Sequence, residues 1–419
     1  MQSWPEPVLP CPPGTGEVVR LFDTPTDELQ PVGGSAAADE PVRIYVCGIT
    51  PYDATHLGHA NTYVAYDLLV RALRDAGRDV VYAQNVTDVD DPLLERAQET
   101  GVDWRDLAES QVELFRGDMT ALRVVPPTVF ASVVDSVDLI AGGVRRMLAA
   151  GAAYRMENGD IYADLSADPL VGSSCGFDRE RMVRLSAENG GDPDRAGKKD
   201  PLDPLLWRAE RPGEPAWNAA ELGRGRPGWH VECACLQEVH LGGKVDVAGG
   251  GSDLVFPHHE LSESHLRVLT GNDHPVGVHS HAGMVGFDGG KMSKSRGNLV
   301  LVSGLLADGA DPMAVRLILL SRHYRADWEY GAADLDAAQQ RLERWRRAVA
   351  LATGPEAGGV LTAVRAALAA DLDAPAAVAA VDRWVDSALA GESAAGGTMS
   401  RSAPAEVSAA VDALLGVAL

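Results

Sequence analysis

The hydrophobic positions in the first quarter of the chain switch between short continuous runs and helical spacing. Residues 42–47 (VRIYVC) form a run that is apolar except for Arg43 and that Gly48 and Pro51 end, which predicts a short buried strand. From about residue 59 to 75 the apolar positions recur three and four residues apart, and residues 80–86 predict a second strand. A strand, a helix and a strand in this order predict a parallel β-α-β unit. Ligands of such sheets bind beyond the carboxyl ends of the strands.

The remainder of the chain predicts more helices, a hairpin and one further strand. Asn158–Gly159, between two tyrosines, is typical of a hairpin turn. Residues 245–248 predict a strand that leads through three glycines into a helix near Pro257. Further helices are expected over 92–122, over 136–150 and over most of the chain after residue 295.

This order of elements predicts an α/β protein with a Rossmann-like parallel sheet, an inserted subdomain and a C-terminal helical domain. The expected boundaries are an N-terminal arm over 1–40, a catalytic domain over 41–303 and a linker with helices over 304–419. The insertion is expected at about residues 123–228, where loops and prolines are frequent.

The composition narrows the class of protein. The formal net charge of −23 disfavours a broad nucleic-acid surface, because phosphate binding depends on Lys and Arg. No stretch approaches the roughly 18 apolar residues of a membrane span, and the first 16 residues lack a basic or apolar signal segment. Five cysteines do not make a disulfide framework in a chain this long. We therefore expect a cytoplasmic protein without a membrane partner. A monomer is also expected.

Two short motifs concentrate groups that bind phosphate. The chain has five lysines against 32 arginines, and Lys291 and Lys294 share one loop beside two glycines. His56 and His59 precede the first predicted helix, where free N–H groups and the positive end of the helix dipole favour phosphate oxygens. Such groups on either side of a triphosphate indicate nucleotide-dependent acyl activation.

Each motif also has a plain structural explanation. The two histidines can belong to a helix-capping turn, the lysines to a solvated loop, and residues 249–253 to a tight turn. Residues 249–253 fit neither a P-loop nor a full G-x-G-x-x-G pattern. The three motifs in this order around a β-α-β unit are nevertheless much more specific than any one of them.

Cysteine and histidine residues at predicted strand and helix ends indicate a metal site. Cys47 ends the first strand, Cys233 follows a Trp-His-Val-Glu segment, and His258 opens a later helix. Two thiolates and an imidazole suit tetrahedral Zn²⁺ with one position left open for a substrate thiolate. The spacing does not choose Cys233 over Cys235. The two other cysteines are expected to be buried small residues: Cys11 and Cys175.

At this point the chain resembles the class I aminoacyl-tRNA synthetases. THLGHA at 55–60 and KMSKS at 291–295 are similar to the two defining motifs of that class. The cysteine branch of the class is more similar still. Its motifs resemble YVCGITPYD at 45–53, NVTDVDDP at 85–92, PGWHVEC at 227–233 and GGGSDLVFPHHE at 249–260.

Two departures distinguish the chain from the cysteinyl-tRNA synthetases. Those enzymes have a glutamate as a fourth metal ligand, one helical turn after the histidine that matches His258. Here that position is Ser262, and Glu263 is rotated off the same helix face. Those enzymes also end in a basic tRNA-reading module, whereas residues 351–419 hold three arginines, no lysine and eight acids. In both departures the chain resembles a truncated branch of the family, the cysteine ligases of mycothiol biosynthesis. Residues 188–193 resemble a motif of that branch, with Asn189 in place of arginine.

The resemblance implies a set of site residues. His56, His59, Lys291 and Lys294 would stabilise charge on the phosphates, and one Zn²⁺ would be held by Cys47, Cys233 and His258. ATP, with Mg²⁺, would be a substrate. The residues expected to line the cysteinyl-adenylate pocket are Cys47, Gly48, Ile49, Thr50, Thr62, Asn85, Val86, Thr87 and Trp229, with Gly251, Ser252, Asp253 and Val285 at the adenosine.

The resemblance also implies a reaction. ATP, L-cysteine and the amine of glucosaminyl-inositol would give the cysteinyl amide, AMP and diphosphate, with small-molecule partners and no tRNA. One alternative is a cysteinyl-tRNA synthetase. An alternative of another class is a catalytically silent relative that binds zinc or nucleotide, against which the intact histidine and lysine motifs argue.

Replacement of Lys294 by alanine tests the phosphate-binding hypothesis. We expect Lys294→Ala to lower cysteine-dependent exchange between ATP and diphosphate on the order of 10²-fold, because one preorganised charge contact is lost. A near-normal exchange rate in this variant would refute the assignment.

Overall fold

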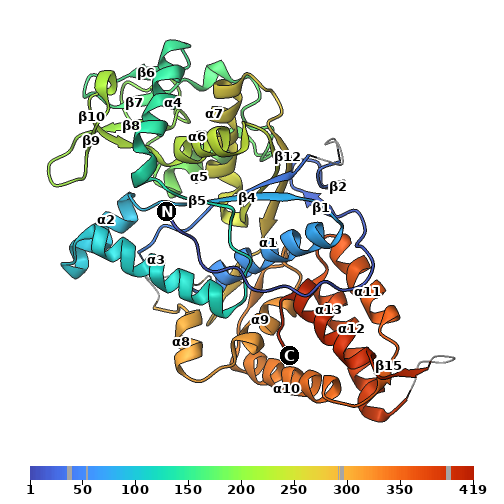
Figure 1. Ribbon diagram of the computed structural model, residues 1–419. Helices are drawn as coiled ribbons and strands as arrows, with labels where there is room; N and C mark the ends of the chain where they lie inside the picture. Colours follow the sequence, from blue (N-terminus) through green and yellow to red (C-terminus); the bar gives the residue numbers. More distant parts are fainter. Residues whose placement is uncertain (35–39, 53–54, 291, 293–296, 393–397) are drawn as a thin grey trace.

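The computed structural model describes residues 1–34, 40–52, 55–290, 292, 297–392 and 398–419. A parallel sheet lies in the middle of the molecule, with an antiparallel sheet and its helices on one side and the C-terminal helices on the other (Figure 1). The two lysines of the KMSKS segment, Lys291 and Lys294, lie outside the described residues. Among the described residues, no helix is both long enough and apolar enough to cross a membrane.

The central sheet confirms the predicted parallel topology. Its five strands run parallel in the order β12-β11-β3-β4-β5. Strands β3 to β5 extend the sheet in one direction and β11 and β12 in the other, so the strand order reverses between β3 and β11. Ligands of open α/β sheets bind at such a reversal. The strands are β3 (Val42–Val46), β4 (Val80–Val86), β5 (Val129–Ser132), β11 (Val245–Gly251) and β12 (Val276–Ala282).

Side chains of β3 alternate between the two faces of this sheet. Val42, Ile44 and Val46 join the core that includes helix α1 (Leu57–Asp75), whereas Tyr45 and the following Cys47 join the core on the other face. That other face is covered by α6 (Trp229–Leu241), which packs on α7 (Glu260–Thr270).

The antiparallel sheet has the order β6-β7-β8-β10-β9. The predicted hairpin at Asn158–Gly159 joins its first two strands, and Gly159 has a φ of +92°. Strand β5, which falls within the expected insertion at 123–228, belongs to the central sheet. The domain boundaries themselves remain a prediction. The elements of this part are α4 (Val137–Ala149), β6 (Ala153–Arg155), β7 (Ile161–Ala163), α5 (Arg179–Glu188), β8 (Leu205–Ala209), β9 (Trp217–Asn218) and β10 (Arg224–Pro227).

One predicted element is wrong in its extent. The helical segment expected over 92–122 consists of two helices, α2 (Asp91–Thr100) and α3 (Trp104–Ala121). Gly101 ends α2 in the left-handed conformation, and Asp103 then caps α3. The strand expected over 245–248 continues to Gly251 as β11. A side chain at Gly249 would collide with the ring of Tyr66, so the glycines allow close packing within the strand instead of forming a turn.

Helices follow the central sheet to the end of the described chain, as predicted, and α10 to α13 gather at the bottom of the molecule (Figure 1). Short strands join these parts. The elements not yet given are β1 (Arg20–Asp23), β2 (Glu28–Pro31), β13 (Val285–Gly286), α8 (Val302–Ala307), α9 (Pro312–Leu320), β14 (Trp328–Glu329), α10 (Ala332–Val349), β15 (Gly354–Pro355), α11 (Gly358–Ala369), α12 (Ala374–Ala390), β16 (Met399–Ser400) and α13 (Ala403–Leu415).

A buried charge cluster joins α1 to the end of the chain. Asp67 in α1 accepts hydrogen bonds from Arg71 and Arg316, and all three side chains are fully buried. Arg316 also donates to the carbonyl oxygen of Leu415, at 2.6 Å, and Arg71 to that of Ala413, at 3.0 Å. Burial alone would raise the pKa of Asp67, but the two guanidinium groups outweigh it and hold that pKa below its usual value.

Removal of the Asp67 carboxylate should leave the guanidinium groups of Arg71 and Arg316 without a counter-charge. We expect Asp67→Asn to lower the free energy of unfolding by about 3–5 kcal/mol, measured by urea denaturation. Asp386→Asn is the matched control, because its partner Arg344 is at the surface, and it should cost less than about 1 kcal/mol. Equal effects of the two substitutions would contradict this account.

Candidate active site

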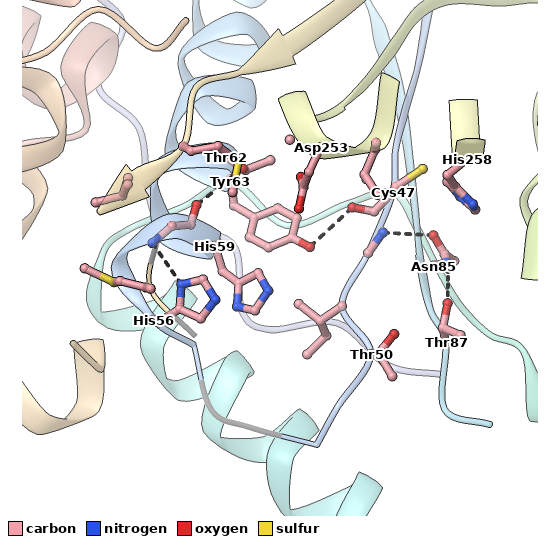
Figure 2. A pocket seen from close by; sticks show the side chains of 18 of the residues that line it. Cys47, Thr50, His56, His59, Thr62, Tyr63, Asn85, Thr87, Asp253 and His258 are labelled. Carbon is pink, nitrogen blue, oxygen red and sulfur yellow. Dashed lines mark hydrogen bonds between the residues drawn. The ribbon is translucent and has the colours of Figure 1, made fainter. Parts of the chain in front are cut away.

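A cavity of about 420 Å³ lies at the carboxyl edge of the central sheet, where the strand order reverses. Figure 2 shows His56 and His59 at one side of it and Cys47 and His258 at the other. The predicted residues that line it are Cys47, Gly48, Ile49, Thr50, His56, His59, Thr62, Asn85, Thr87, Trp229, Cys233, Gly251, Asp253, His258 and Val285. Sequence regions more than 200 residues apart therefore meet in one cavity.

Two predicted pocket residues, Val86 and Ser252, are not part of the lining. Val86 follows Asn85 on β4, so its side chain points to the opposite face and is buried in the core with α1. Ser252 is the first residue of a 3₁₀ turn (Ser252–Leu254). Its neighbours Gly251 and Asp253 do line the cavity.

The cavity also has lining residues that the sequence did not single out. Tyr63, one turn after His59 on α1, donates a hydrogen bond to the carbonyl oxygen of Cys47 at 3.3 Å. Its spacing from His59 was a usable signal, because residues four apart share a helix face. The others are Tyr52, Leu254, Gly283, Met284, Met292 and Leu299, and Gly58 of the THLGHA segment lines the cavity as well.

His56 and His59 combine a capping role with a place in the cavity. The His56 Nδ1 atom accepts a hydrogen bond from the Gly58 N–H group at 3.1 Å, so this side chain is the N-cap of α1. The two imidazole rings stack with centroids 4.0 Å apart. The capping explanation and the pocket explanation are therefore compatible, because the same turn opens α1 and faces the cavity.

The segment after the lysine loop is held against the same turn. The Leu57 N–H group donates to the carbonyl oxygen of Val300 at 2.9 Å, and the Val302 N–H group donates to that of Thr55 at 3.0 Å. On the other flank, the Gly289 N–H group donates to Glu329 of β14 at 2.7 Å. The THLGHA segment and both flanks of the KMSKS segment thus lie at one side of the sheet edge.

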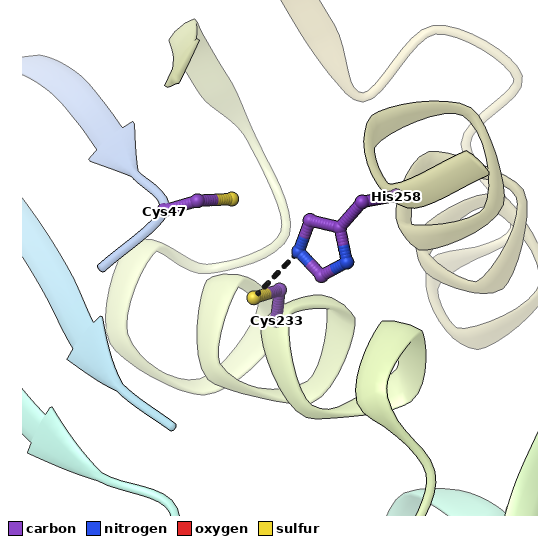
Figure 3. A group of neighbouring side chains, drawn as sticks. All are labelled: Cys47, Cys233 and His258. Atoms are coloured by element: carbon purple, nitrogen blue, oxygen red, sulfur yellow. Dashed lines mark hydrogen bonds between the residues drawn. The ribbon is translucent and has the colours of Figure 1, made fainter. Parts of the chain in front are cut away.

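Cys47, Cys233 and His258 form a compact cluster in the cavity wall. Figure 3 shows them converging from the end of β3, the first turns of α6 and the π-helical turn before α7. Their candidate ligand atoms all lie within 4.8 Å of one another, and His258 Nε2 is 3.2 Å from Cys233 Sγ. Ligands of one tetrahedral Zn²⁺ lie roughly 3.5–4 Å apart, given bonds of about 2.0–2.3 Å. The three residues therefore fit a zinc ion.

The electrostatic setting of the cluster also suits a cation. A hydrogen bond with Cys233, together with burial, raises the pKa of the Cys47 thiol well above its usual value. Burial lowers the pKa of His258 well below its usual range, so its imidazole is neutral, as a metal ligand must be. A dication would supply the charge that thiolates at this buried place require.

The second nitrogen of His258 has its own partner. His258 Nδ1 lies 3.1 Å from Nδ1 of His230, whose pKa burial lowers to about 3, so that one neutral ring accepts from the other. Ser262, which stands where the synthetases have a glutamate, donates to the carbonyl oxygen of His230 at 3.0 Å. Glu263 is engaged by His279 at 2.6 Å and by Arg267 at 3.0 Å. The cluster therefore has three candidate protein ligands among the described residues.

The other cysteines lie elsewhere. Cys235 is buried against Gly143 of α4, where a side chain at position 143 would collide with its sulfur. Cys175 is buried, as predicted. Cys11 is exposed, so the prediction that it is buried was wrong.

Residues 188–193 form no part of the cavity lining. The carboxylate of Asp192 accepts from Lys198 at 3.0 Å and from the Tyr162 hydroxyl, so it is used within the insertion. Asn189 donates from its side chain to the carbonyl oxygen of Leu185 at 2.8 Å and thereby completes the end of α5. The Gly-Gly-Asp-Pro segment thus has a structural explanation in its own loop.

Comparisons with known proteins agree with this geometry. The family model described as tRNA synthetases class I (C) catalytic domain matches residues 35–340, and the chain belongs to this family. An L-cysteine:1D-myo-inositol 2-amino-2-deoxy-alpha-D-glucopyranoside ligase of Cellulomonas flavigena is 60% identical over 421 residues, which cover all of both chains. The ligase of the same name from Kineococcus radiotolerans is 58% identical over 426 residues, again with full coverage.

A solved structure supports the fold. Mycobacterium tuberculosis methionyl-tRNA synthetase bound by methionyl-adenylate aligns with a TM-score of 0.62 at 17% identity, covering 90% of this chain and 92% of that chain. The α/β architecture of the class I synthetases is thus confirmed.

Paired cysteine substitutions test the metal cluster. We expect Cys233→Ala to abolish stoichiometric zinc, because one of three ligands is lost, and to abolish cysteine activation with it. Cys235→Ala is the matched control from the same helix and should retain the metal. The zinc content of both variants is measured by atomic absorption. Full zinc occupancy in Cys233→Ala would overturn the ligand assignment.

Proposed function

We propose that this chain is an ATP-dependent ligase that activates L-cysteine as cysteinyl-adenylate. It then transfers the cysteinyl group to the amine of 1D-myo-inositol 2-amino-2-deoxy-α-D-glucopyranoside (glucosaminyl-inositol). The products are the cysteinyl amide, AMP and diphosphate, in mycothiol biosynthesis. Relatives of that name at 55–60% identity over the full length support this proposal.

The observation that carries the proposal is one cavity with two chemically different ends. One end has the cysteine and histidine cluster, and the other has two histidines at the first turn of α1. L-cysteine has a thiol at one end and a carboxylate at the other, and activation requires a nucleotide at the carboxylate. The two ends of the cavity match the two ends of this substrate.

In the first half-reaction, a carboxylate oxygen of cysteine attacks the α-phosphorus of ATP. A C–O–P linkage forms, the bond between the α- and β-phosphates breaks, and diphosphate leaves. His56 and His59, together with Lys291 and Lys294 of the KMSKS segment, would stabilise the charge on the phosphates. Mg²⁺ is expected to accompany ATP. Gly251, Asp253 and Val285 would hold the adenosine portion.

At the thiol end, a Zn²⁺ held by Cys47, Cys233 and His258 would take the substrate sulfur as a ligand. A soft thiolate is favoured over a serine hydroxyl there, so selection needs no editing site. Trp229 stacks on the His258 ring with centroids 4.3 Å apart and fixes its orientation. Thr50, Thr62, Asn85 and Thr87 would line the aminoacyl part of the pocket.

In the second half-reaction, the amine of the acceptor attacks the activated carbonyl carbon. A C–N bond forms, the bond from that carbon to the phosphate oxygen breaks, and AMP leaves. The phosphate of AMP can take the proton that the amine loses. A small acceptor is expected for this step, because the acidic segment 351–419 offers little for tRNA binding. The protein is expected to act as a cytoplasmic monomer.

One experiment separates this function from tRNA charging. Purified protein, ATP and radiolabelled cysteine are mixed either with glucosaminyl-inositol or with bulk tRNA. We expect cysteine to appear in an amide of the glucosaminyl-inositol, with one AMP formed per product, and none to appear on tRNA. Acylated tRNA would instead establish a cysteinyl-tRNA synthetase, and absence of diphosphate exchange would indicate a catalytically silent relative.

A further inference from the structure

One buried amide in the cavity wall connects the two ends of the site. Asn85, near the carboxyl end of β4, is 1% exposed and makes hydrogen bonds in two directions (Figure 2). Its Oδ1 atom accepts from the Gly48 N–H group at 2.9 Å and from the Tyr45 hydroxyl at 3.2 Å. Its Nδ2 atom donates to the Thr87 hydroxyl oxygen at 3.1 Å.

The orientation of this amide follows from its partners. A backbone N–H group can only donate, so the Asn85 atom that faces Gly48 must be the oxygen. The nitrogen then faces Thr87, whose oxygen must accept. The hydroxyl hydrogen of Thr87 is consequently directed away from Asn85, and Thr87 lines the cavity.

The other end of the amide fixes the metal side of the site. Gly48 follows Cys47 directly, so the bond from Gly48 to Asn85 holds the end of β3 from which the Cys47 sulfur projects. A side chain at Gly48 would collide with the backbone of Asn85, which shows how closely the two strands approach there. The thiol of Cys233 also lies 3.8 Å from Asn85 Oδ1.

A cysteine substrate makes this connection important. Only two carbon atoms separate its sulfur from its carboxyl carbon, so the sulfur-binding and acyl-binding groups must keep a fixed separation. Misplacement by about 1 Å can cost on the order of 10²-fold in rate. Asn85 joins the strand end that bears Cys47 to the hydroxyl of Thr87 through one side chain.

We propose that Asn85 is a positioning residue that fixes the Thr87 hydroxyl as a hydrogen-bond donor toward the aminoacyl group, in register with the sulfur site. This rests on the proposed function and adds to it a role for a residue that acts through its neighbours. The amide does not need to touch the substrate for this role.

A double-mutant cycle tests the inference. Asn85→Asp keeps an oxygen for the Gly48 N–H group and loses the N–H donor to Thr87, while Thr87→Val removes the hydroxyl at constant shape. We expect Asn85→Asp to lower kcat of cysteine-dependent diphosphate exchange on the order of tenfold in the wild-type background, but about twofold or less in the Thr87→Val background. The KM for ATP and the zinc content should not change. Asn85→Ala also removes the oxygen that accepts from Gly48 and Tyr45, so it should lower kcat further than Asn85→Asp and keep part of that loss in the Thr87→Val background.

Gln84→Ala is the matched control. Gln84 precedes Asn85 on β4, is equally buried at 1% exposed, and accepts from the Tyr82 hydroxyl at 2.8 Å on the other face of the sheet. It should lower thermal stability without lowering kcat. The inference would be overturned if the losses of kcat from Asn85→Asp and Thr87→Val were independent and multiplied, or if both Asn85 variants lost zinc. Normal exchange in the wild-type protein would uphold the proposed function in either case. Absence of exchange in the wild-type protein would refute both.

Discussion

The length of the substrate is the constraint on which the rest of the site depends. Groups that recognise sulfur and groups that stabilise phosphate differ in chemistry, yet a cysteine molecule requires both within a few ångströms. The parallel sheet meets this requirement at the reversal between β3 and β11, where the carboxyl ends of strands and the first turn of α1 converge. The fold therefore supplies the proximity, and the side chains supply the chemistry.

Alternation along β3 explains how one short strand serves both the core and the site. Ile44 and Val46 point toward α1 and stabilise the sheet, while Tyr45 and Cys47 point toward α6 on the other face, where Cys233 and His258 meet Cys47. A shift of register by one residue would exchange these faces. The apolar packing against α1 thus also fixes the direction of the Cys47 sulfur, and stability and function share one constraint.

Much of this arrangement could be predicted from the sequence, and the failures have physical causes. The β-α-β unit and the meeting of Cys47, His56 and Asn85 followed from local patterns and from the rule that ligands bind at carboxyl ends. The choice between Cys233 and Cys235 did not follow from the sequence pattern. Residues two apart on a helix point about 200° apart, and only the packing of Cys235 against Gly143 decides that Cys233 faces the sheet. The strand through Gly249 was predicted too short because a glycine can either form a turn or admit a neighbouring ring within a strand.

The position of the last helix has a consequence for how the protein is made. The carbonyl oxygens of Ala413 and Leu415 complete the hydrogen bonds of Arg71 and Arg316, which lie on helices built much earlier in the chain. Before α13 is synthesised, these guanidinium groups lack those acceptors. A nascent chain can therefore form the sheet during translation, but it closes the interior beneath α1 only once α13 has emerged.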